Sequence, residues 1–321
     1  MDGLMRSILL PALPVARVQV LRVLVYAFVV LDILTLSGDV IAHAGNSDFY
    51  TPLLLARTLH IPAVTSLIAQ LLRAVILLAC VAAVAGWKPR ISGAVVALAF
   101  WAWMFYSQGY GYVAHDHMAL MVAVAVLPTV ATPSAHRPGD PASPHGPAQL
   151  AASGAPVDER RSEAAGWALR CIQIAVVATY FFSIVPKTLY SGSLAAWGNS
   201  AILTWASVRR GSLLAHWLVA HTPWVFVPAQ WIGLALETLS PVVLFLRGRA
   251  LYIAIALYMS FHLATLVLLG IHFLPTVICW AAFLPLERWR ELGRGRRKGR
   301  APRTPRTPAD GSGSGSGTMT A

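Results

Sequence analysis

The sequence has few charged residues and very few cysteines. Only 12% of its 321 residues are Asp, Glu, Lys or Arg, whereas a soluble domain carries about twice that fraction. The three cysteines, Cys80, Cys171 and Cys279, all lie within apolar stretches and form no CxxC motif. These absences argue against a soluble globular domain, and they exclude a disulfide framework and a cysteine-based metal site.

Hydrophobic residues make up 57% of the chain and occur in long runs. A transmembrane helix needs about 20 apolar residues, because each residue rises about 1.5 Å along the axis. The runs predict an all-α, polytopic membrane helix bundle with about eight transmembrane helices, of which the fourth and eighth are short. Their expected bounds are 17–37, 63–86, 91–108, 115–132, 165–186, 225–246, 250–269 and 272–287.

Basic residues are distributed unevenly between the two sides of this predicted bundle. If the N-terminus is cytoplasmic, 18 of the 25 lysines and arginines fall on the cytoplasmic side, and without the C-terminal tail nine still fall there. The outer side then has only Arg57, Lys187, Arg209 and Arg210. The positive-inside rule therefore predicts a multi-pass protein of the cell membrane with both termini in the cytoplasm. The same topology explains the net charge of +12, so the expected partner of the basic residues is the lipid bilayer and not a nucleic acid.

Composition divides the chain into five parts. A cytoplasmic N-terminal segment (1–16) precedes the first half of the transmembrane bundle (17–132). A stretch rich in Pro, Ala, Gly and Ser (133–164) is typical of a flexible cytoplasmic linker, and the second half of the bundle (165–290) follows it. The last part (291–321) is basic and ends in a Gly/Ser repeat, so it is predicted to be a disordered tail.

Two outer loops contain many aromatic residues. Residues 38–62 mix polar and aromatic side chains, and residues 187–224 contain four tryptophans, at positions 197, 205, 217 and 224. Tryptophans at this density are typical of helices that lie in the membrane interface. We therefore expect an interfacial helical segment on the outer face, and a pocket that opens outward.

Polar residues inside spans need a physical reason, because burying them in a bilayer is costly. Arg73 lies near the middle of the second span and Glu237 near the middle of the sixth. Their similar depth and opposite charge predict an intramembrane pair that joins two helices. Asp32 lies in the outer part of the first span, where it is expected to join the outer cavity.

Histidines gather toward the outer side. His115, Asp116 and His117 open the fourth span. Residues two apart do not share a helix face, so the His-x-His pair predicts no metal site, and His117 is expected to act singly as an acid, base or hydrogen-bonding group. His262, in the seventh span, is expected to make a helix-to-helix hydrogen bond in preference to ligating haem, because His272 is not at a matched depth.

Lys187 follows the apolar run TYFFSIVP at the outer end of the fifth span. Such a lysine can snorkel to the surface. Pro186 is expected to break the helix beside it, and the following loop is crowded with aromatic residues. A lysine that is partly removed from water can instead act as a general base. The sequence is compatible with both interpretations, a lysine that reaches the surface and a lysine that acts as a base.

Three segments resemble the vitamin K-dependent γ-glutamyl carboxylase group, which includes bacterial HTTM-domain membrane proteins. The first is TYFFSIVPKTLYSGSLAAWGNSAI (179–202), with an aromatic-rich span, a lysine and then Trp-Gly. The second is AHDHMALM (114–121), and the third is SFHLATLVLLGIHFLPTVICWAAFLP (260–285). Their order and spacing cover much of residues 17–290.

The resemblance implies a membrane enzyme that acts on a quinone-like or other lipid-soluble substrate at the outer face. Lys187 would be the base that deprotonates a hydroquinone cofactor, and His117 would stabilise charge near the quinone oxygens. Substrate-binding residues would be His262, Trp197, Asp116 and Tyr180. The chain differs from the carboxylase in having no large lumenal domain, in Asp116 where the family has Asn, and in Ile184-Val185-Pro186 before the lysine.

A non-catalytic function is the alternative. The bundle would then bind a lipid, a small molecule or a secreted peptide, as an immunity or export partner does. A solute transporter is disfavoured because the sequence shows no paired internal repeat.

Overall fold

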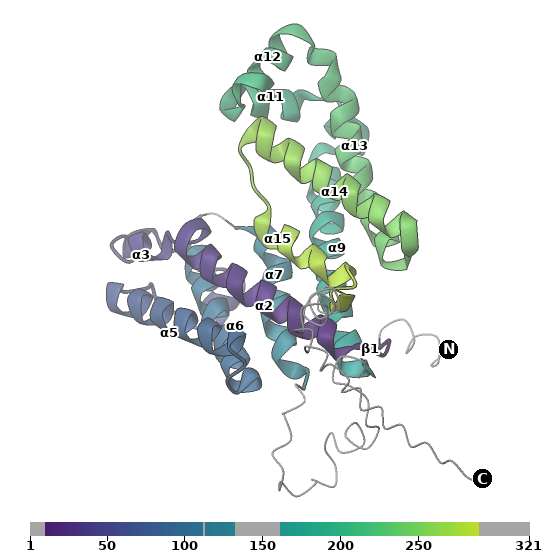
Figure 1. Ribbon diagram of the computed structural model, residues 1–321. Coiled ribbons are helices and arrows are strands. Elements are labelled where there is room, and N and C mark those ends of the chain that lie inside the picture. Colours follow the sequence, from purple (N-terminus) through teal and green to yellow (C-terminus); the bar gives the residue numbers. More distant parts are fainter. Residues whose placement is uncertain (1–9, 112, 132–160, 289–321) are drawn as a thin grey trace, which may run out of the picture. The chain divides into compact units, whose positions relative to one another are not determined.

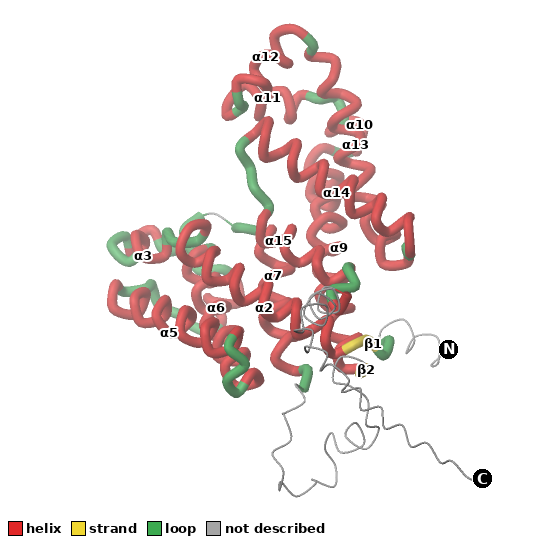
Figure 2. The backbone as a smooth tube through the Cα atoms, in the orientation of Figure 1, coloured by secondary structure: helices red, strands yellow, loops and turns green. Residues whose placement is uncertain are grey.

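The computed structural model describes residues 10–111, 113–131 and 161–288. Most of the predicted linker and all of the predicted tail lie outside these residues. The described chain is mostly helical, as Figure 2 shows in red. The first half comprises β1 (Leu13–Pro14), α2 (Val15–Leu31), the π-helix η1 (Asp32–Leu36), α3 (Val40–His43), η2 (Ser47–Phe49), α4 (Leu54–Thr58), α5 (Ser66–Val84), α6 (Pro89–Ser107), η3 (His115–His117), α7 (Met118–Val126) and η4 (Leu127–Thr129).

The second half contains the longest helix and a group of short ones (Figure 1). Its elements are β2 (Arg161–Ser162), α9 (Glu163–Ser191), α10 (Leu194–Trp197), α11 (Ala201–Arg210), α12 (Leu213–His221), η6 (Pro223–Val225), α13 (Phe226–Leu239), η7 (Ser240–Phe245), α14 (Gly248–Leu269), α15 (Leu274–Cys279) and η8 (Trp280–Phe283). The predicted all-α helix bundle is confirmed.

Six helices of the described chain are long and apolar enough to cross a membrane. They are 15–36, 66–84, 89–107, 163–191, 223–245 and 248–269, and each coincides with a predicted span. The fourth and eighth predicted spans are shorter helices, α7 with η4 and α15 with η8. Many large apolar side chains on the long helices face outward, as in a multi-pass membrane protein.

Side-chain contacts give the direction of the fourth segment. Arg22 donates to the carbonyl oxygen of Leu127 at 2.6 Å and to that of Val130. Asp32, ten residues further along the same helix, contacts His117. The segment from His117 to Val130 therefore runs antiparallel to α2. These contacts also explain why the Arg22 side chain is buried, because it donates to carbonyl groups that are left free where this short helix ends.

Contacts also give the direction of the fifth, sixth and eighth segments. Leu13 pairs with Ser162 in the two-residue sheet, so α2 and α9 begin at the same end of the bundle, which we call the basal end. Arg170 donates to the carbonyl of Leu244, so η7 also finishes near this end. The eighth segment returns there too, since Glu287 forms an ion pair with Arg17 at 2.6 Å. The first described segment thus begins, and the last one ends, at the basal end.

The opposite end, which we call the apical end, contains the predicted interfacial segment. Residues 187–224 are helical, in the C-terminal turn of α9 and in α10, α11 and α12. Trp205, Leu213 and Trp217 project large apolar side chains from α11 and α12 into the surroundings. Arg209 lies over the ring of Trp205, 5.1 Å from its centroid. Apolar and basic groups on one surface are typical of a helix in the headgroup region.

One local prediction was wrong. Pro186 does not break the helix beside Lys187, because α9 continues through it to Ser191 and ends at Gly192, whose φ of 75° is left-handed. A proline removes one helical hydrogen bond. Apolar helices tolerate this loss when neighbouring groups satisfy the free carbonyl. Lys187 is therefore a residue of the last helical turns and not of a loop.

Candidate functional site

The Lys187 ammonium forms an ion pair with Glu237, on α13. Lys187 Nζ contacts both carboxylate oxygens of Glu237. The two side chains are only 20% and 13% exposed. Lys187 Nζ also lies 5.7 Å from the centroid of the Trp197 ring. The charged group is thus held on one side by a carboxylate and on another by an aromatic face, which attracts a cation.

The predicted pair between Arg73 and Glu237 was wrong. Arg73 donates to Gln70 at 2.8 Å, one turn earlier on α5, and this contact is exposed. Glu237 faces Lys187 on α9 instead. The similar depth of Arg73 and Glu237 gave no information about which face of each helix they occupy. An arginine side chain is also long enough to reach the edge of a bundle from the middle of a helix.

A pocket lies beside the Lys187–Glu237 ion pair. Its volume is about 220 Å³. Apolar side chains form most of its wall, and Lys187 and Glu237 are its charged residues. The lining comes from α9, α10, α11, α13 and α14: Lys187, Trp197, Ile202, Leu203, Ala206, Ala229, Gln230, Gly233, Leu234, Glu237, Phe261, Thr265 and Leu269. An apolar pocket with a few convergent polar groups is the usual form of a small-molecule site.

Gln230 fixes the wall that the short helices contribute to this pocket. Its amide nitrogen donates to the carbonyl oxygen of Trp197, and its amide oxygen accepts from the backbone N–H of Leu203 at 3.3 Å. One side chain of α13 thereby holds both α10 and the start of α11. Gly198 allows a further close contact, because a Cβ there would lie 2.6 Å from the ring of Trp231.

Tyr180 and His262 form a second group, which does not line the pocket. The Tyr180 hydroxyl is hydrogen-bonded to His262 Nε2, and Trp280 Nε1 donates to the same hydroxyl at 2.9 Å. His262 therefore makes the helix-to-helix hydrogen bond that its sequence position suggested. Tyr258 packs on Tyr180, with ring centroids 4.9 Å apart, and donates to the carbonyl oxygen of Leu236 at 2.6 Å. This group thus reaches the backbone immediately before the pocket carboxylate.

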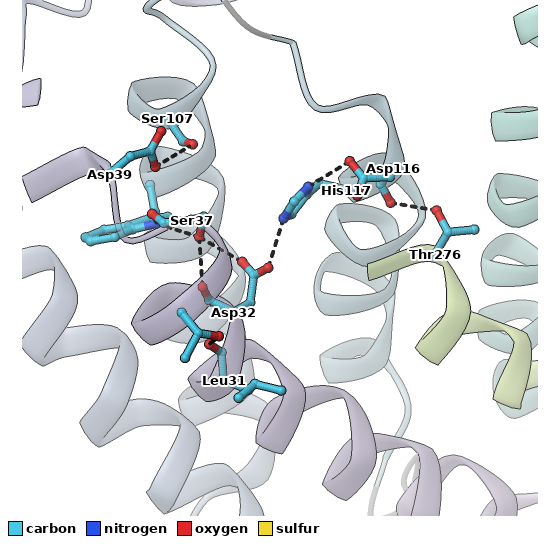
Figure 3. Close-up of polar contacts among 10 residues, drawn as sticks. Leu31, Asp32, Ser37, Asp39, Ser107, Asp116, His117 and Thr276 are labelled. Carbon is cyan, nitrogen blue, oxygen red and sulfur yellow. Dashed lines mark hydrogen bonds and ion pairs between the residues drawn. The ribbon is translucent and has the colours of Figure 1, made fainter. Parts of the chain in front are cut away.

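A third group surrounds His117, as Figure 3 shows. His117 Nε2 lies 2.9 Å from Asp32 Oδ1, and His117 Nδ1 lies 3.1 Å from Asp116 Oδ1. Ser37 donates to Asp32 Oδ2 at 2.9 Å. Trp103, on α6, donates to the Ser37 hydroxyl at 3.0 Å. The three ionisable side chains therefore lie in a connected network of hydrogen bonds.

Local chain geometry produces this third group. His115–His117 form a 3₁₀ turn. Within this turn, the side chains of His117 and Asp116 contact each other. On α2, the helix becomes a π-helix at Asp32, and Ser37 follows its end. His115 turns toward Phe273, with ring centroids 6.1 Å apart. The sequence marked Asp32 and His117 separately but gave no signal that they touch.

The pKa of His117 is raised to about 9. Burial alone would lower the pKa, because it disfavours the charged imidazolium. The hydrogen bonds to Asp116 and Asp32, together with their negative charges, outweigh this penalty. In the described part of the chain, no three His, Cys, Asp or Glu residues are placed to hold a metal ion.

The structure brings only some of the predicted site residues together. Lys187 and Trp197 share the pocket with Glu237, which the sequence had assigned to a structural pair. His117 and Asp116 form the separate cluster with Asp32. The remaining two predicted substrate-binding residues, Tyr180 and His262, contact each other between helices.

Comparison with family models, with curated proteins and with solved structures finds no match to this chain.

Proposed function

We propose that this multi-pass membrane protein binds a lipid-soluble molecule with a polar end in the pocket beside Lys187 and Glu237, and acts on it there. The observation that carries the proposal is a charged pair within an apolar pocket. An apolar wall favours a hydrophobic ligand, while the pair offers both a hydrogen-bond donor and an acceptor. A hydrocarbon without a polar end would leave the pair unused.

A quinone-type ring is the ligand class that the sequence resemblance suggests. The ammonium of Lys187 can donate to a ring oxygen, and the flat ring of Trp197 provides an apolar wall beside it. These features support a quinone or hydroquinone as cofactor or substrate. Neither feature depends on His117, which does not line the pocket.

Catalysis at this site would use the ion pair as a unit. Lys187 is an ammonium held by a carboxylate, so it acts as a base only after its own proton moves to Glu237. When a hydroquinone enters, the phenolic O–H bond breaks and its electron pair stays on oxygen. The proton passes to the pair, with Glu237 as the final acceptor, and the ammonium of Lys187 stabilises the phenolate.

Binding of decylubiquinone to the purified protein in nanodiscs tests this proposal. Replacing Lys187 by Met removes one charge-assisted hydrogen bond, which contributes about 1.5–3 kcal/mol, so the affinity should fall about tenfold or more. The matched control is Arg73→Met, which removes a cation that lies outside the pocket and contacts Gln70. Equal affinities in the two variants, or no binding by the unsubstituted protein, would refute the quinone assignment.

The intact ion pair also favours the non-catalytic alternative, because a lysine held by a carboxylate is stable without turnover. The pocket would then hold a lipid, a small molecule or the apolar part of a secreted peptide. Stopped-flow absorbance of decylubiquinol separates the two functions. Phenolate formation that depends on Glu237 supports catalysis, and binding without any phenolate supports a carrier or immunity role.

The distribution of charges supports the orientation that we propose for the bundle. Basic residues of the described chain gather at the basal end, where Arg17, Arg161, Arg247 and Arg249 lie at or beside the starts of α2, α9 and α14. By the positive-inside rule, this supports a basal end on the cytoplasmic side of the cell membrane and a pocket at the outer face. A cysteine-labelling reagent that cannot cross membranes should reach an added apical cysteine from outside intact cells.

A further inference from the structure

Three ionisable side chains meet beside η1 in a nearly dry environment. The side chains of Asp32, Asp116 and His117 are 0%, 9% and 6% exposed. A buried ionisable group in a membrane protein is costly and marks a site of ion or proton chemistry more often than a surface charge does. The pocket beside Lys187 does not include these residues, so the proposed function leaves them unexplained.

The contacts determine the chemical form of the histidine. Each ring nitrogen of His117 faces a carboxylate oxygen, at 2.9 Å for Nε2 and 3.1 Å for Nδ1. A neutral imidazole has one N–H and one lone pair, so it would aim a lone pair at a carboxylate. The imidazolium has two N–H groups and satisfies both contacts. Because both nitrogens are engaged, His117 is not free to ligate a metal ion.

Among the described residues, Asp32 and Asp116 are the charged side chains that contact His117. Asp32, the first residue of η1, contacts His117, and Ser37, which follows η1, donates to Asp32 (Figure 3). Trp103, on α6, donates to the Ser37 hydroxyl. Thr276, on α15, donates to the backbone carbonyl of Asp116 at 2.7 Å. The charge of the cluster therefore depends on the proton of His117. Loss of that proton would leave two carboxylates in mutual repulsion.

The two carboxylates differ in their access to other groups. Asp32 is fully buried, and its oxygens are occupied by His117 and Ser37. Asp116 is the carboxylate of the cluster that keeps a small exposed surface. It is therefore the more accessible of the two carboxylates.

We propose that Asp32, His117 and Asp116 form a buried proton-binding site, in which His117 holds an exchangeable proton and Asp116 is the group through which the proton exchanges. In the exchange step, the His117 Nδ1–H bond breaks and its electron pair stays on nitrogen. An O–H bond forms on Asp116 Oδ1, and the proton then leaves toward solvent. Asp32 remains a carboxylate and holds the ring in place. This site is independent of the pocket at Lys187.

Nitrogen NMR of protein labelled with ¹⁵N-histidine, in nanodiscs, tests the proposal. A His117→Gln variant assigns the signals. The expected result is an imidazolium at about pH 8, where an ordinary histidine is neutral, together with ring N–H groups that exchange with water in the folded protein. A neutral His117 at that pH would overturn the proposal. So would N–H groups that exchange only when the protein unfolds, because the cluster would then be a structural clamp.

The role of Asp116 is tested by exchange rates in variants. Asp116→Asn should slow His117 N–H exchange at least tenfold. Asp39→Asn should leave the rate unchanged, because Asp39 is half exposed and contacts Ser107 at 3.3 Å, outside the cluster. If Asp116→Asn does not fold, the exchange rate of the unsubstituted protein still decides whether the proton is exchangeable. An unchanged rate in folded Asp116→Asn would remove Asp116 from the exchange route.

Discussion

Removing either partner of the Lys187–Glu237 ion pair should destabilise the protein, whereas removing both should be mild. A single substitution such as Lys187→Met leaves an unpaired carboxylate in an apolar pocket. Breaking a fully buried pair costs about 3–5 kcal/mol, and an exposed pair contributes less than about 1 kcal/mol. The side chains here are 20% and 13% exposed, so each single substitution should cost about 2–3 kcal/mol.

The double variant Lys187→Met, Glu237→Leu distinguishes the pair from two independent residues. Two apolar side chains can pack against each other and against the pocket wall, so no charge is left unpaired. The double variant should therefore be less destabilised than the two single variants combined, with a coupling free energy of about 1–3 kcal/mol. Arg73→Met is the control and should change stability by less than about 0.5 kcal/mol, since its contact is exposed.

Unfolding can be followed by a thiol-reactive fluorescent dye. Cys80 and Cys279 are buried, and Cys171 is partly buried, so the dye reacts as the bundle opens. The unfolding midpoint of each single variant should fall by about 5 °C or more, while that of Arg73→Met should stay near the parent value. Additive effects of the two single substitutions would refute the ion pair. Coupling of Glu237→Leu to Arg73→Met, and not to Lys187→Met, would restore the pair that the sequence suggested.

Three further outcomes follow from other parts of the structure. Arg22→Met should destabilise the bundle by about 2–3 kcal/mol, measured by the same dye assay, because two buried carbonyl groups lose their charged donor. The folded-state pKa of His117 is about 9, above its ordinary value of about 6.5. Its contribution to stability should therefore be complete below about pH 6.5 and be lost as the pH rises through 9, and His117→Gln should flatten this part of the stability–pH curve. Gly166→Ala should destabilise α9 although alanine favours helices, because its Cβ would lie 1.6 Å from the carbonyl oxygen of Pro11; Gly233→Ala, with its nearest contact at 3.6 Å, should be tolerated.

The bundle itself was predictable because the relevant signal is local. A helix in a bilayer must satisfy its own backbone hydrogen bonds, so length and hydropathy alone indicate a span. All six long helices coincide with predicted spans. The two short segments were also located, although their polar starts at His115 and His272 made their lengths ambiguous. Pro186 misled the prediction because a proline stops a helix in water more reliably than within an apolar bundle.

The sequence determined by itself that this is an all-α, multi-pass membrane protein, and it singled out Lys187, Glu237, His117 and Asp32 as groups that need partners. Only the tertiary structure decided which partners they have. Glu237 lies 50 residues from Lys187 in the chain, and Asp32 lies 85 residues from His117. Depth along a helix can be counted from the sequence, but the face that a side chain occupies depends on how each helix packs against its neighbours. The packing of the helices therefore brought Glu237 into contact with Lys187, whereas Arg73 contacts Gln70 on its own helix.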